Sequence, residues 1–242
     1  MANAFRNANS DVERFGYKLI KNYKHDPAAF TQGLVLENGI VFESTGKYEG
    51  QSSIRKVDLE TGEILKKVNL PDDQFGEGLT MVGDKLYQLT WKKGICHVYD
   101  KQLNKLDLEF KYDGQGWGLT YDGNHLVMSD GTSRLFFLDP ETFEEVRSVN
   151  VRNGLASING LNELEYTGGK IYANRWQWDT IYKIDPDTGK VEGLIDLKNI
   201  WPKNQRPEEG VLNGIAVDDR GKLIVTGKYC PNIFEIVPMR SN

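Results

Sequence analysis

The sequence has few residues of the kinds that carry metal-based or nucleophilic chemistry. Its 242 residues include two cysteines, Cys96 and Cys230, and three histidines, which are too few for a disulfide framework. It contains no His-Glu-x-x-His motif, no closely paired cysteines, no Walker loop and no Gly-x-Ser-x-Gly motif. These absences argue against a zinc hydrolase, a P-loop nucleotide-binding protein and an α/β-hydrolase.

The sequence also lacks an excess of positive charge and any long apolar run. Thirty Lys and Arg against 35 Asp and Glu leave a net charge of -5, so nothing in the charge favours nucleic acid or an anionic membrane as partner. No apolar run reaches the roughly 18 residues of a membrane-spanning helix, and the first residues lack the apolar centre of a signal peptide. We expect a globular protein whose ligand is small or peptidic.

A short pattern recurs along the chain roughly every 45 residues, an interval typical of repeat architectures. In each copy a bulky aliphatic residue ends a group of three. The copies are Gln32-Gly33-Leu34, Glu77-Gly78-Leu79, Trp117-Gly118-Leu119, Asn162-Glu163-Leu164 and Asn213-Gly214-Ile215. A second marker, an aspartate before a turn signal, has a similar period at Asp58, Asp100, Asp139 and Asp185. Two independent markers therefore give a similar period, and the first of them occurs in five units.

Each unit has runs typical of β-strands. A second run follows each copy of the pattern, at 40–45, 86–91, 126–131, 171–176 and 223–228. A third predicted strand ends at the aspartate that serves as the second marker, and in a fourth predicted strand apolar and polar residues alternate. The last unit has only three runs, of which the third is 233–237. The missing fourth pattern occurs instead at 16–23, directly before the first unit.

These units predict an all-β fold, a five-bladed β-propeller with four antiparallel strands per blade. We expect one domain over residues 1–242, in which the strand at 16–23 pairs with 233–237 and completes the last blade. This closure would also pair sheet edges that otherwise invite aggregation. We expect residues 1–15 to be a poorly ordered N-terminal extension. A linear array or two domains would leave the last unit one strand short.

The predicted ring brings one residue from each unit to its axis, because the first strand of each blade lines the central channel. These residues are Gln32, Glu77, Trp117, Asn162 and Asn213, and the second strands end beside them at Thr45, Trp91, Gly131, Trp176 and Lys228. A purely structural ring would favour similar small residues in every unit, whereas these differ. We therefore expect a binding or catalytic site with one carboxylate and three tryptophans. The alternative is that the tryptophans only plug the channel and that the carboxylate only caps a strand.

Taken together, these segments resemble the glutaminyl-peptide cyclotransferases of the plant and bacterial type, which are five-bladed propellers. The resemblance runs from about Tyr17 to Ile236. The segments that carry it are Phe30-Thr-Gln-Gly-Leu34, Phe75-Gly-Glu-Gly-Leu-Thr80, Gln88-Leu-Thr-Trp91, Gly116-Trp-Gly-Leu-Thr120, Leu161-Asn-Glu-Leu-Glu165, Ala173-Asn-Arg-Trp-Gln177 and Thr226-Gly-Lys228. Each is weak alone, but their order and spacing are specific. The sequence departs from the family pattern at Arg175 and Cys230.

The resemblance implies an enzyme that converts the N-terminal glutamine of peptides and proteins into pyroglutamate and releases ammonia, without a metal in catalysis. It implies that Glu77 is the general acid/base, with Lys228 and Asn162 as further catalytic residues. The implied substrate-binding residues are Gln32, Trp91, Trp117, Trp176, Phe30 and Phe75, to which the ring adds Asn213. It also implies a secreted or periplasmic protein. We expect a monomer with no nucleic-acid partner and no membrane span.

The chemistry of these residues agrees with that role. The α-amine of a peptide has a pKa of about 7.7–8.0, so it is mostly protonated at neutral pH. Glu77 would accept the ammonium proton and return it to the departing amide nitrogen. The indoles would exclude water and raise the pKa of Glu77, Lys228 and Asn162 would donate to the oxyanion, and Gln32 would hold a carbonyl or amide of the substrate.

Two other classes of function stay open. Gln32, Glu77, Asn162 and Asn213 all carry side-chain oxygens, which suit a hard cation such as Ca²⁺, and propeller lactonases and related hydrolases use such a site. A structural Ca²⁺ in the channel is compatible with either enzyme. The third reading is a propeller that binds peptides or partner proteins without catalysis. It does not require a buried glutamate walled by tryptophans.

Overall fold

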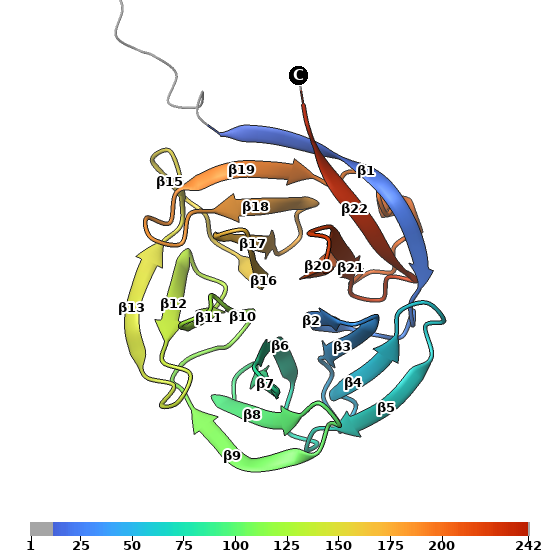
Figure 1. The fold of residues 1–242 in the computed structure, drawn as a ribbon, viewed down its shortest axis with the longest axis vertical. Helices are drawn as coiled ribbons and strands as arrows, with labels where there is room; N and C mark the ends of the chain where they lie inside the picture. The colour runs from blue at the N-terminus through green and yellow to red at the C-terminus, as the bar shows by residue number, and fades with distance from the viewer. Residues whose placement is uncertain (1–11, 242) are drawn as a thin grey trace, which may run out of the picture.

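The computed structural model describes residues 12–241, whose regular structure is almost entirely β-strand. The sheets stand in a ring around a central axis, with one strand of each group innermost (Figure 1). Three sheets have four antiparallel strands each, in chain order from the axis outward. They are β2 (Thr31–Glu37), β3 (Ile40–Thr45), β4 (Ser53–Asp58) and β5 (Ile64–Asn69); β6 (Gly76–Val82), β7 (Lys85–Thr90), β8 (Ile95–Asp100) and β9 (Lys105–Lys111); and β10 (Leu119–Tyr121), β11 (Leu126–Ser129), β12 (Arg134–Leu138) and β13 (Glu145–Asn150).

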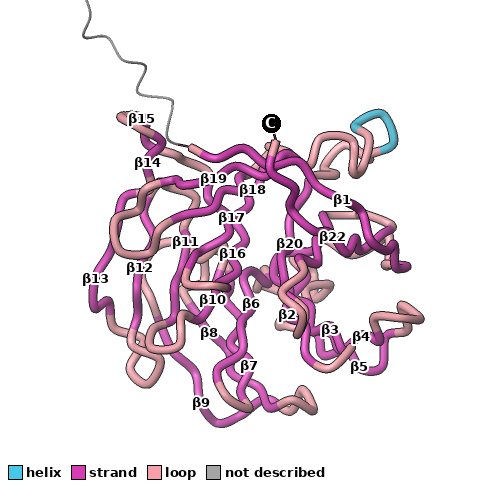
Figure 2. Tube along the Cα trace, turned by 45° about the horizontal axis from the view of Figure 1, so that its top comes forward, coloured by secondary structure: helices cyan, strands magenta, loops and turns pink. Residues whose placement is uncertain are grey.

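The other large sheet has eight strands, in the order β16-β17-β18-β19-β1-β22-β21-β20. Its strands are β1 (Glu13–Lys24), β16 (Leu161–Thr167), β17 (Lys170–Arg175), β18 (Thr180–Ile184), β19 (Val191–Asp196), β20 (Leu212–Val217), β21 (Leu223–Gly227) and β22 (Asn232–Arg240). A short hairpin of β14 (Arg152–Asn153) and β15 (Ala156–Ser157) and a 3-10 turn at Lys203–Gln205 complete the elements (Figure 2). The all-β prediction is confirmed. Within residues 12–241 no helix has the length and apolarity needed to cross a membrane.

The predicted pairing of the N-terminal strand with the last strand is also confirmed. β1 pairs antiparallel with β22 from Phe15↔Arg240 to Lys24↔Asn232, so two segments from opposite ends of the chain lie side by side. Its first residues also pair in parallel with β19, from Glu13↔Gly193 to Phe15↔Ile195. Residues 13–15 are therefore part of a strand and not of an extension, and residues 1–11 of the expected extension lie outside the described residues.

The cores lie between neighbouring sheets, because both faces of the inner strands are apolar. Phe42 and Ile54 of the first sheet pack against Leu79 and Leu86 of the next. Similar clusters join the second sheet to the third and the third to β16–β19. The outer strand β5 is mostly exposed. Each sheet is thus held by its two neighbours, and the ring is a single packed unit.

The innermost strands approach one another backbone to backbone, which explains the glycine in the repeated pattern. A Cβ atom on Gly33 would lie 2.4 Å from the Leu79 nitrogen, and one on Gly118 would lie 1.9 Å from the Asn162 carbonyl oxygen. No other residue fits such an approach. In the fourth copy of the pattern the equivalent residue is Glu163, whose buried carboxylate accepts hydrogen bonds from the Leu34 nitrogen at 3.3 Å and the Ile215 nitrogen at 2.7 Å. This side chain therefore ties together three innermost strands.

Candidate active site

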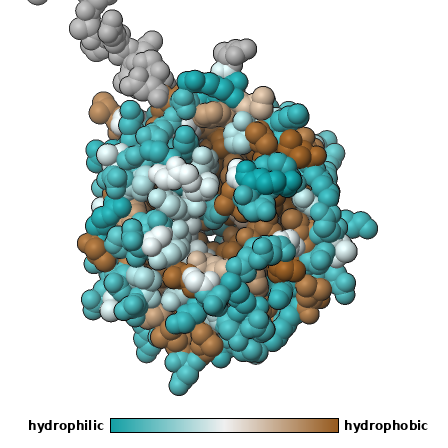
Figure 3. All heavy atoms as spheres, in the orientation of Figure 1, coloured by the Kyte–Doolittle hydropathy of each residue, from teal (hydrophilic) through white to brown (hydrophobic). Residues whose placement is uncertain are grey.

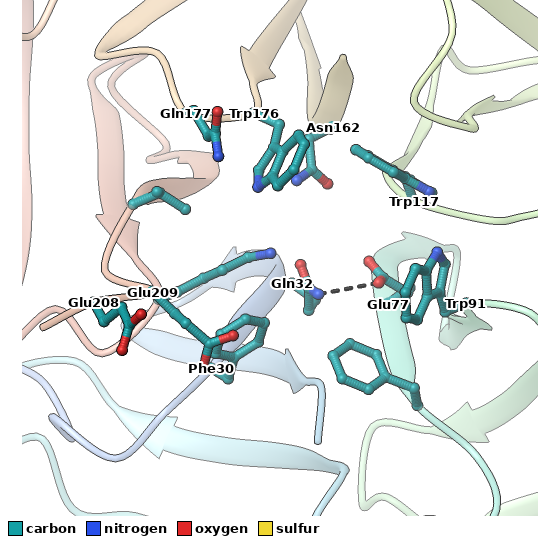
Figure 4. Close-up of a pocket in the computed structure, with 13 residues that line it drawn as sticks. Phe30, Gln32, Glu77, Trp91, Trp117, Asn162, Trp176, Gln177, Glu208 and Glu209 are labelled. Atoms are coloured by element: carbon teal, nitrogen blue, oxygen red, sulfur yellow. Dashed lines mark hydrogen bonds between the residues drawn. The ribbon is translucent and has the colours of Figure 1, made fainter. Parts of the chain in front are cut away.

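A cavity of about 470 Å³ opens at the axis of the ring, visible as a hollow near the centre of Figure 3. It collects the predicted site residues from distant parts of the chain, with the exception of Asn213 (Figure 4). Those that line it are Phe30, Gln32, Phe75, Glu77, Trp91, Trp117, Asn162, Trp176 and Lys228, together with Gln177, Glu208, Glu209 and Val211. The expectation that the repeat brings these side chains together therefore holds in the structure.

Irregularities in the innermost strands redirect four of the predicted axial side chains, three of which line the cavity. The register of strand pairing shifts between Thr31 and Gly33, between Gly76 and Leu79, between Leu161 and Leu164, and between Leu212 and Ile215. Such a β-bulge inserts an extra residue and redirects a side chain. Gln32, Glu77, Asn162 and Asn213 all lie within these shifts. The repeated sequence pattern thus marks a repeated bulge at the axis.

Glu77 is the carboxylate at the centre of the cavity. It is only 4% exposed, and its Oε1 accepts a hydrogen bond from Gln32 Nε2 at 3.0 Å. Burial raises the pKa of Glu77 well above its ordinary value, and the nearby charge of Lys228 opposes this rise in part. A carboxylate with a raised pKa is a stronger base once ionised, so Glu77 is suited to take and return a proton at neutral pH.

Asn213 has a different position from the one predicted. It is buried and does not line the cavity. Its Nδ2 donates to the Thr31 carbonyl oxygen at 3.0 Å and to Gln32 Oε1 at 3.2 Å. Because the carbonyl end of the Gln32 amide is held in this way, its amino end points at Glu77. Asn213 therefore lies behind Gln32, where it positions the Gln32 amide.

Lys228 and Asn162 supply polar groups that the described part of the chain leaves available. Lys228 is buried, and desolvation lowers its pKa, against the effect of Glu77 and Glu209. Its ammonium nitrogen lies 4.5 Å from the centre of the Phe30 ring. Asn162 is buried, and its Oδ1 has no hydrogen-bond partner among residues 12–241. Asn162 also lines the cavity, so its side chain borders the space that a ligand would occupy.

Aromatic rings form the walls. Phe75 packs against Phe30 and Trp91, with ring centres 6.0 Å and 5.6 Å apart, and Trp117 meets Trp176 edge to face at 6.2 Å. A residue outside the predicted set orients two of the indoles, because Gln115 Oε1 accepts from Trp91 Nε1 at 2.7 Å and from Trp117 Nε1 at 3.1 Å. Both indole N–H groups are thereby engaged with Gln115.

The repeat analysis missed Gln177, Glu208, Glu209 and Val211 at the cavity. Gln177 lies in the turn after β17, and the other three lie in the loop between β19 and β20. Arg206 fastens this loop, because it pairs with Asp179 at 2.7 Å. The long interval before the last copy of the pattern and the two prolines and paired glutamates of residues 199–211 predict a rim loop here, but they do not indicate what this loop contacts. The departures at Arg175 and Cys230 lie outside the cavity lining, and Arg175 stacks over Trp178 at 4.5 Å.

The oxygen-bearing residues near the axis are arranged around one another. Gln32 bonds to both Glu77 and Asn213, so three of the four side chains considered for a hard cation form one hydrogen-bonded chain. Over residues 12–241 no three His, Cys, Asp or Glu side chains are grouped as metal ligands. The geometry thus combines a buried carboxyl group with a raised pKa, a buried lysine amine and aromatic walls, which suits an organic substrate with an amide or amine.

Comparison with known proteins places the chain in a family. The family model described as glutamine cyclotransferase matches residues 1–237. The chain belongs to this family. It is 42% identical over 227 residues to a glutaminyl-peptide cyclotransferase of Arabidopsis thaliana, a match covering 90% of this chain and 70% of the relative.

Solved structures agree with this membership. The crystal structure of Myxococcus xanthus glutaminyl cyclase is 37% identical and superposes with a TM-score of 0.89 over 96% of this cyclotransferase-family chain and 100% of that one. The WD40 β-propeller domain of Doa1 is 12% identical, with a TM-score of 0.51 over 84% of this chain and 62% of that one. The second likeness concerns the fold alone, and it supports the propeller-like arrangement of the sheets.

Proposed function

We propose that the protein is a glutaminyl-peptide cyclotransferase, which converts the N-terminal glutamine of a peptide or protein into pyroglutamate and releases ammonia. Membership of the family and the names of the two similar proteins support this activity. The observation that carries the mechanism is the buried Glu77 carboxylate, with its raised pKa, in a cavity walled by aromatic rings.

In the reaction the α-amine nitrogen attacks the side-chain carboxamide carbon of the same glutamine. A carbon–nitrogen bond forms and closes a five-membered lactam, the carbon–nitrogen bond to the side-chain NH₂ breaks, and ammonia leaves. No external nucleophile or oxidant is needed. The enzyme must hold the flexible side chain in a folded conformation, and such positioning of reacting groups lowers the barrier substantially. The aromatic walls formed by Phe75, Trp91, Trp117 and Trp176 are suited to this task.

Glu77 serves both proton transfers. As a carboxylate it accepts a proton from the substrate amine, and as an acid it delivers that proton to the departing nitrogen. Because burial raises its pKa toward that of the amine, neither transfer is strongly uphill, which is the condition for efficient acid/base catalysis. Gln32 donates a hydrogen bond to the same carboxylate and keeps it aimed.

Lys228 and Asn162 stabilise the charge that develops on the carboxamide oxygen. Both line the cavity, and both are buried, so their donors act in a region from which water is largely excluded. Donors fixed in place before the reaction are among the largest contributions to catalysis. The aromatic contact of Lys228 with Phe30 at 4.5 Å helps to hold the ammonium group without neutralising it.

Replacing Glu77 with Gln tests this mechanism. The amide has the size of the carboxylate and can still accept the Gln32 hydrogen bond, so the melting temperature should change little. Ammonia release from a Gln-Ala dipeptide should fall by about 10²–10⁴-fold, the usual contribution of a positioned acid/base group. Glu144→Gln, at an exposed turn between β12 and β13, is the matched control and should keep full activity. Retained activity in Glu77→Gln would end this mechanism.

We further propose that catalysis needs no metal ion. The acid/base carboxylate, the oxyanion donors and the aromatic walls together supply each step described above. Activity should therefore survive prolonged treatment with a chelator. If the chelator abolishes activity and Ca²⁺ restores it, the result would instead favour a calcium-dependent hydrolase or a structural Ca²⁺ in the channel. Family resemblance also leads us to propose a secreted or periplasmic monomer, which cell fractionation and sedimentation would check.

We infer that the ring is a five-bladed propeller, in which the eight-stranded sheet comprises two blades. β16–β19 form one group, and β20, β21, β22 and β1 form the other. Among the described residues, strand pairing joins the two groups only between residues 13–15 and 193–195. Both begin with an innermost strand that carries the register shift seen in β2 and β6. Five copies of the sequence pattern support the same number.

A further inference from the structure

A second hollow adjoins the cavity on the side of Phe30 and Phe75. It measures about 300 Å³ and shares Phe30, Phe75 and Glu209 with the cavity. Its remaining lining residues are Gly46, Lys47, Tyr48, Glu49, Gln51 and Tyr229. We call it the outer groove. Because the two hollows share these residues, a chain that leaves the cavity over Phe30 and Phe75 reaches the groove.

A peptide substrate needs such a path, and the inference therefore rests on the proposed function. Only the first residue reacts, and its carbonyl group carries the rest of the peptide. Glu77 and Gln32 line the cavity and are both buried, and Glu163 bridges the innermost strands by hydrogen bonds. The second residue must therefore lie toward the mouth. Tyr48, in the outer groove, is 43% exposed, so the groove leads from the cavity to solvent.

The aromatic surface of the cavity continues into the outer groove. Tyr229 packs on Phe30 with ring centres 5.1 Å apart, and Tyr48 packs on Phe75 at 5.2 Å. Because Phe30 and Phe75 are themselves in contact, the four rings form one connected surface. A flat side chain of the second substrate residue could lie on it.

The backbone of the outer groove is held in an uncommon conformation. Glu49 and Tyr229 have φ angles of 62° and 59°, in the left-handed region that non-glycine residues rarely adopt. Residues kept in this region often lie at binding sites, where the surrounding structure holds them. Here the Glu49 nitrogen donates to the Asp72 carbonyl oxygen at 3.1 Å, and the Tyr229 nitrogen donates to that of Ala29 at 2.6 Å. The groove walls are thus preorganised.

The charge of the outer groove favours a cation. Two carboxylates, Glu49 and Glu209, line it against the single ammonium group of Lys47. Glu209 is close enough to Tyr229 and Lys228 to influence both. A guanidinium group stacks on aromatic rings and pairs with carboxylates at the same time. We propose that the outer groove binds the second residue of the peptide substrate and that it prefers arginine there to an acidic residue.

The test compares kcat/KM for the peptides Gln-Arg-Ala, Gln-Ala-Ala and Gln-Glu-Ala. Gln-Arg-Ala should exceed Gln-Glu-Ala by about tenfold, mainly through KM, and the difference should shrink at high salt because the groove is exposed. Tyr48→Ala and Glu49→Gln should each bring the ratio closer to one. Tyr48→Phe, which keeps the ring, and Glu144→Gln, an exposed glutamate on another sheet, should leave the ratio unchanged.

The outcomes distinguish failure of the proposed function from failure of the outer groove to bind the second substrate residue. If none of the three peptides is cyclised, the proposed function fails, and the inference fails with it. If all three are cyclised with equal kcat/KM, the function stands and the preference for arginine is overturned. A preference that neither Tyr48→Ala nor Glu49→Gln reduces would also overturn the assignment to the outer groove.

Discussion

The hydrogen bond from Gln32 to Glu77 allows the basicity of the acid/base carboxylate to be changed by a single substitution. The two atoms lie 3.0 Å apart, and both side chains are buried. A hydrogen bond to an ionised group contributes about 1.5–3 kcal/mol, and one pKa unit corresponds to about 1.4 kcal/mol. Gln32→Leu removes the donor and disfavours the ionised form. We therefore expect the pKa of Glu77, already raised by burial, to rise further.

The assay is the pH dependence of kcat/KM for ammonia release from a Gln-Ala dipeptide between about pH 5 and pH 9. The acidic limb of this profile reports ionisation of the essential base in the free enzyme. In Gln32→Leu this limb should move to higher pH, so activity below the limb should fall by about 10- to 100-fold, as expected for the loss of one hydrogen bond to an ionised group. Gln102→Leu, at an exposed turn, should leave the profile in place.

A different result would refute this reasoning. If kcat/KM falls by the same factor at every pH and the acidic limb stays in place, Gln32 acts only on the substrate. That outcome would agree with the simpler expectation from the sequence, in which Gln32 holds a carbonyl or amide of the substrate. It would also mean that the bond from Asn213 to Gln32 has no part in setting the pKa of Glu77.

Two further predictions concern residues outside the first set of candidates. Burial raises the pKa of Glu165 to about 8. The stability that this group contributes is therefore complete below its unfolded pKa and is lost as pH rises toward 8. The melting temperature of Glu165→Gln should rise relative to that of the wild type between pH 5 and pH 8, and a constant difference would contradict this. Gln115→Leu frees the indoles of Trp91 and Trp117 and should lower kcat/KM by about 5- to 10-fold, since one hydrogen bond contributes about 1 kcal/mol. Gln115→Glu keeps the acceptor and should restore most of the activity, whereas equal losses in both variants would exclude a positioning role.

Much of the fold could be predicted from the sequence because its signals are local and repeated. Alternation of apolar and polar residues marks strands, and the aspartates mark turns between them. The pairing of 16–23 with 233–237 followed from counting strands in the last unit, and β1 pairs with β22 as expected. The parallel contact of residues 13–15 with β19 could not be predicted in this way, because the edge of one group of strands meets the next only in the closed ring.

The candidate site, too, could be predicted from the sequence only in part. The repeated pattern by itself determined that Gln32, Glu77 and Asn162 meet at the axis, because equivalent positions of repeated units converge there. It could not separate Asn213 from Asn162, since both occupy the same position of the repeat; packing against Gln32 puts only one of them behind the cavity wall. Glu209 lies in a loop with no counterpart in the other units, so the repeat could not predict that it lines the cavity.

The pKa of Glu77 depends still more fully on the tertiary structure. Its neighbours in the sequence are glycines, which neither bury nor charge it. Phe75 is close to it in the sequence, but Trp117, Trp176 and Lys228 belong to strands and turns far away in the chain. The sequence alone determined which residue carries the acid, through its place in a repeat. Only the closed ring decides how basic that acid is, because desolvation depends on what surrounds a group in space.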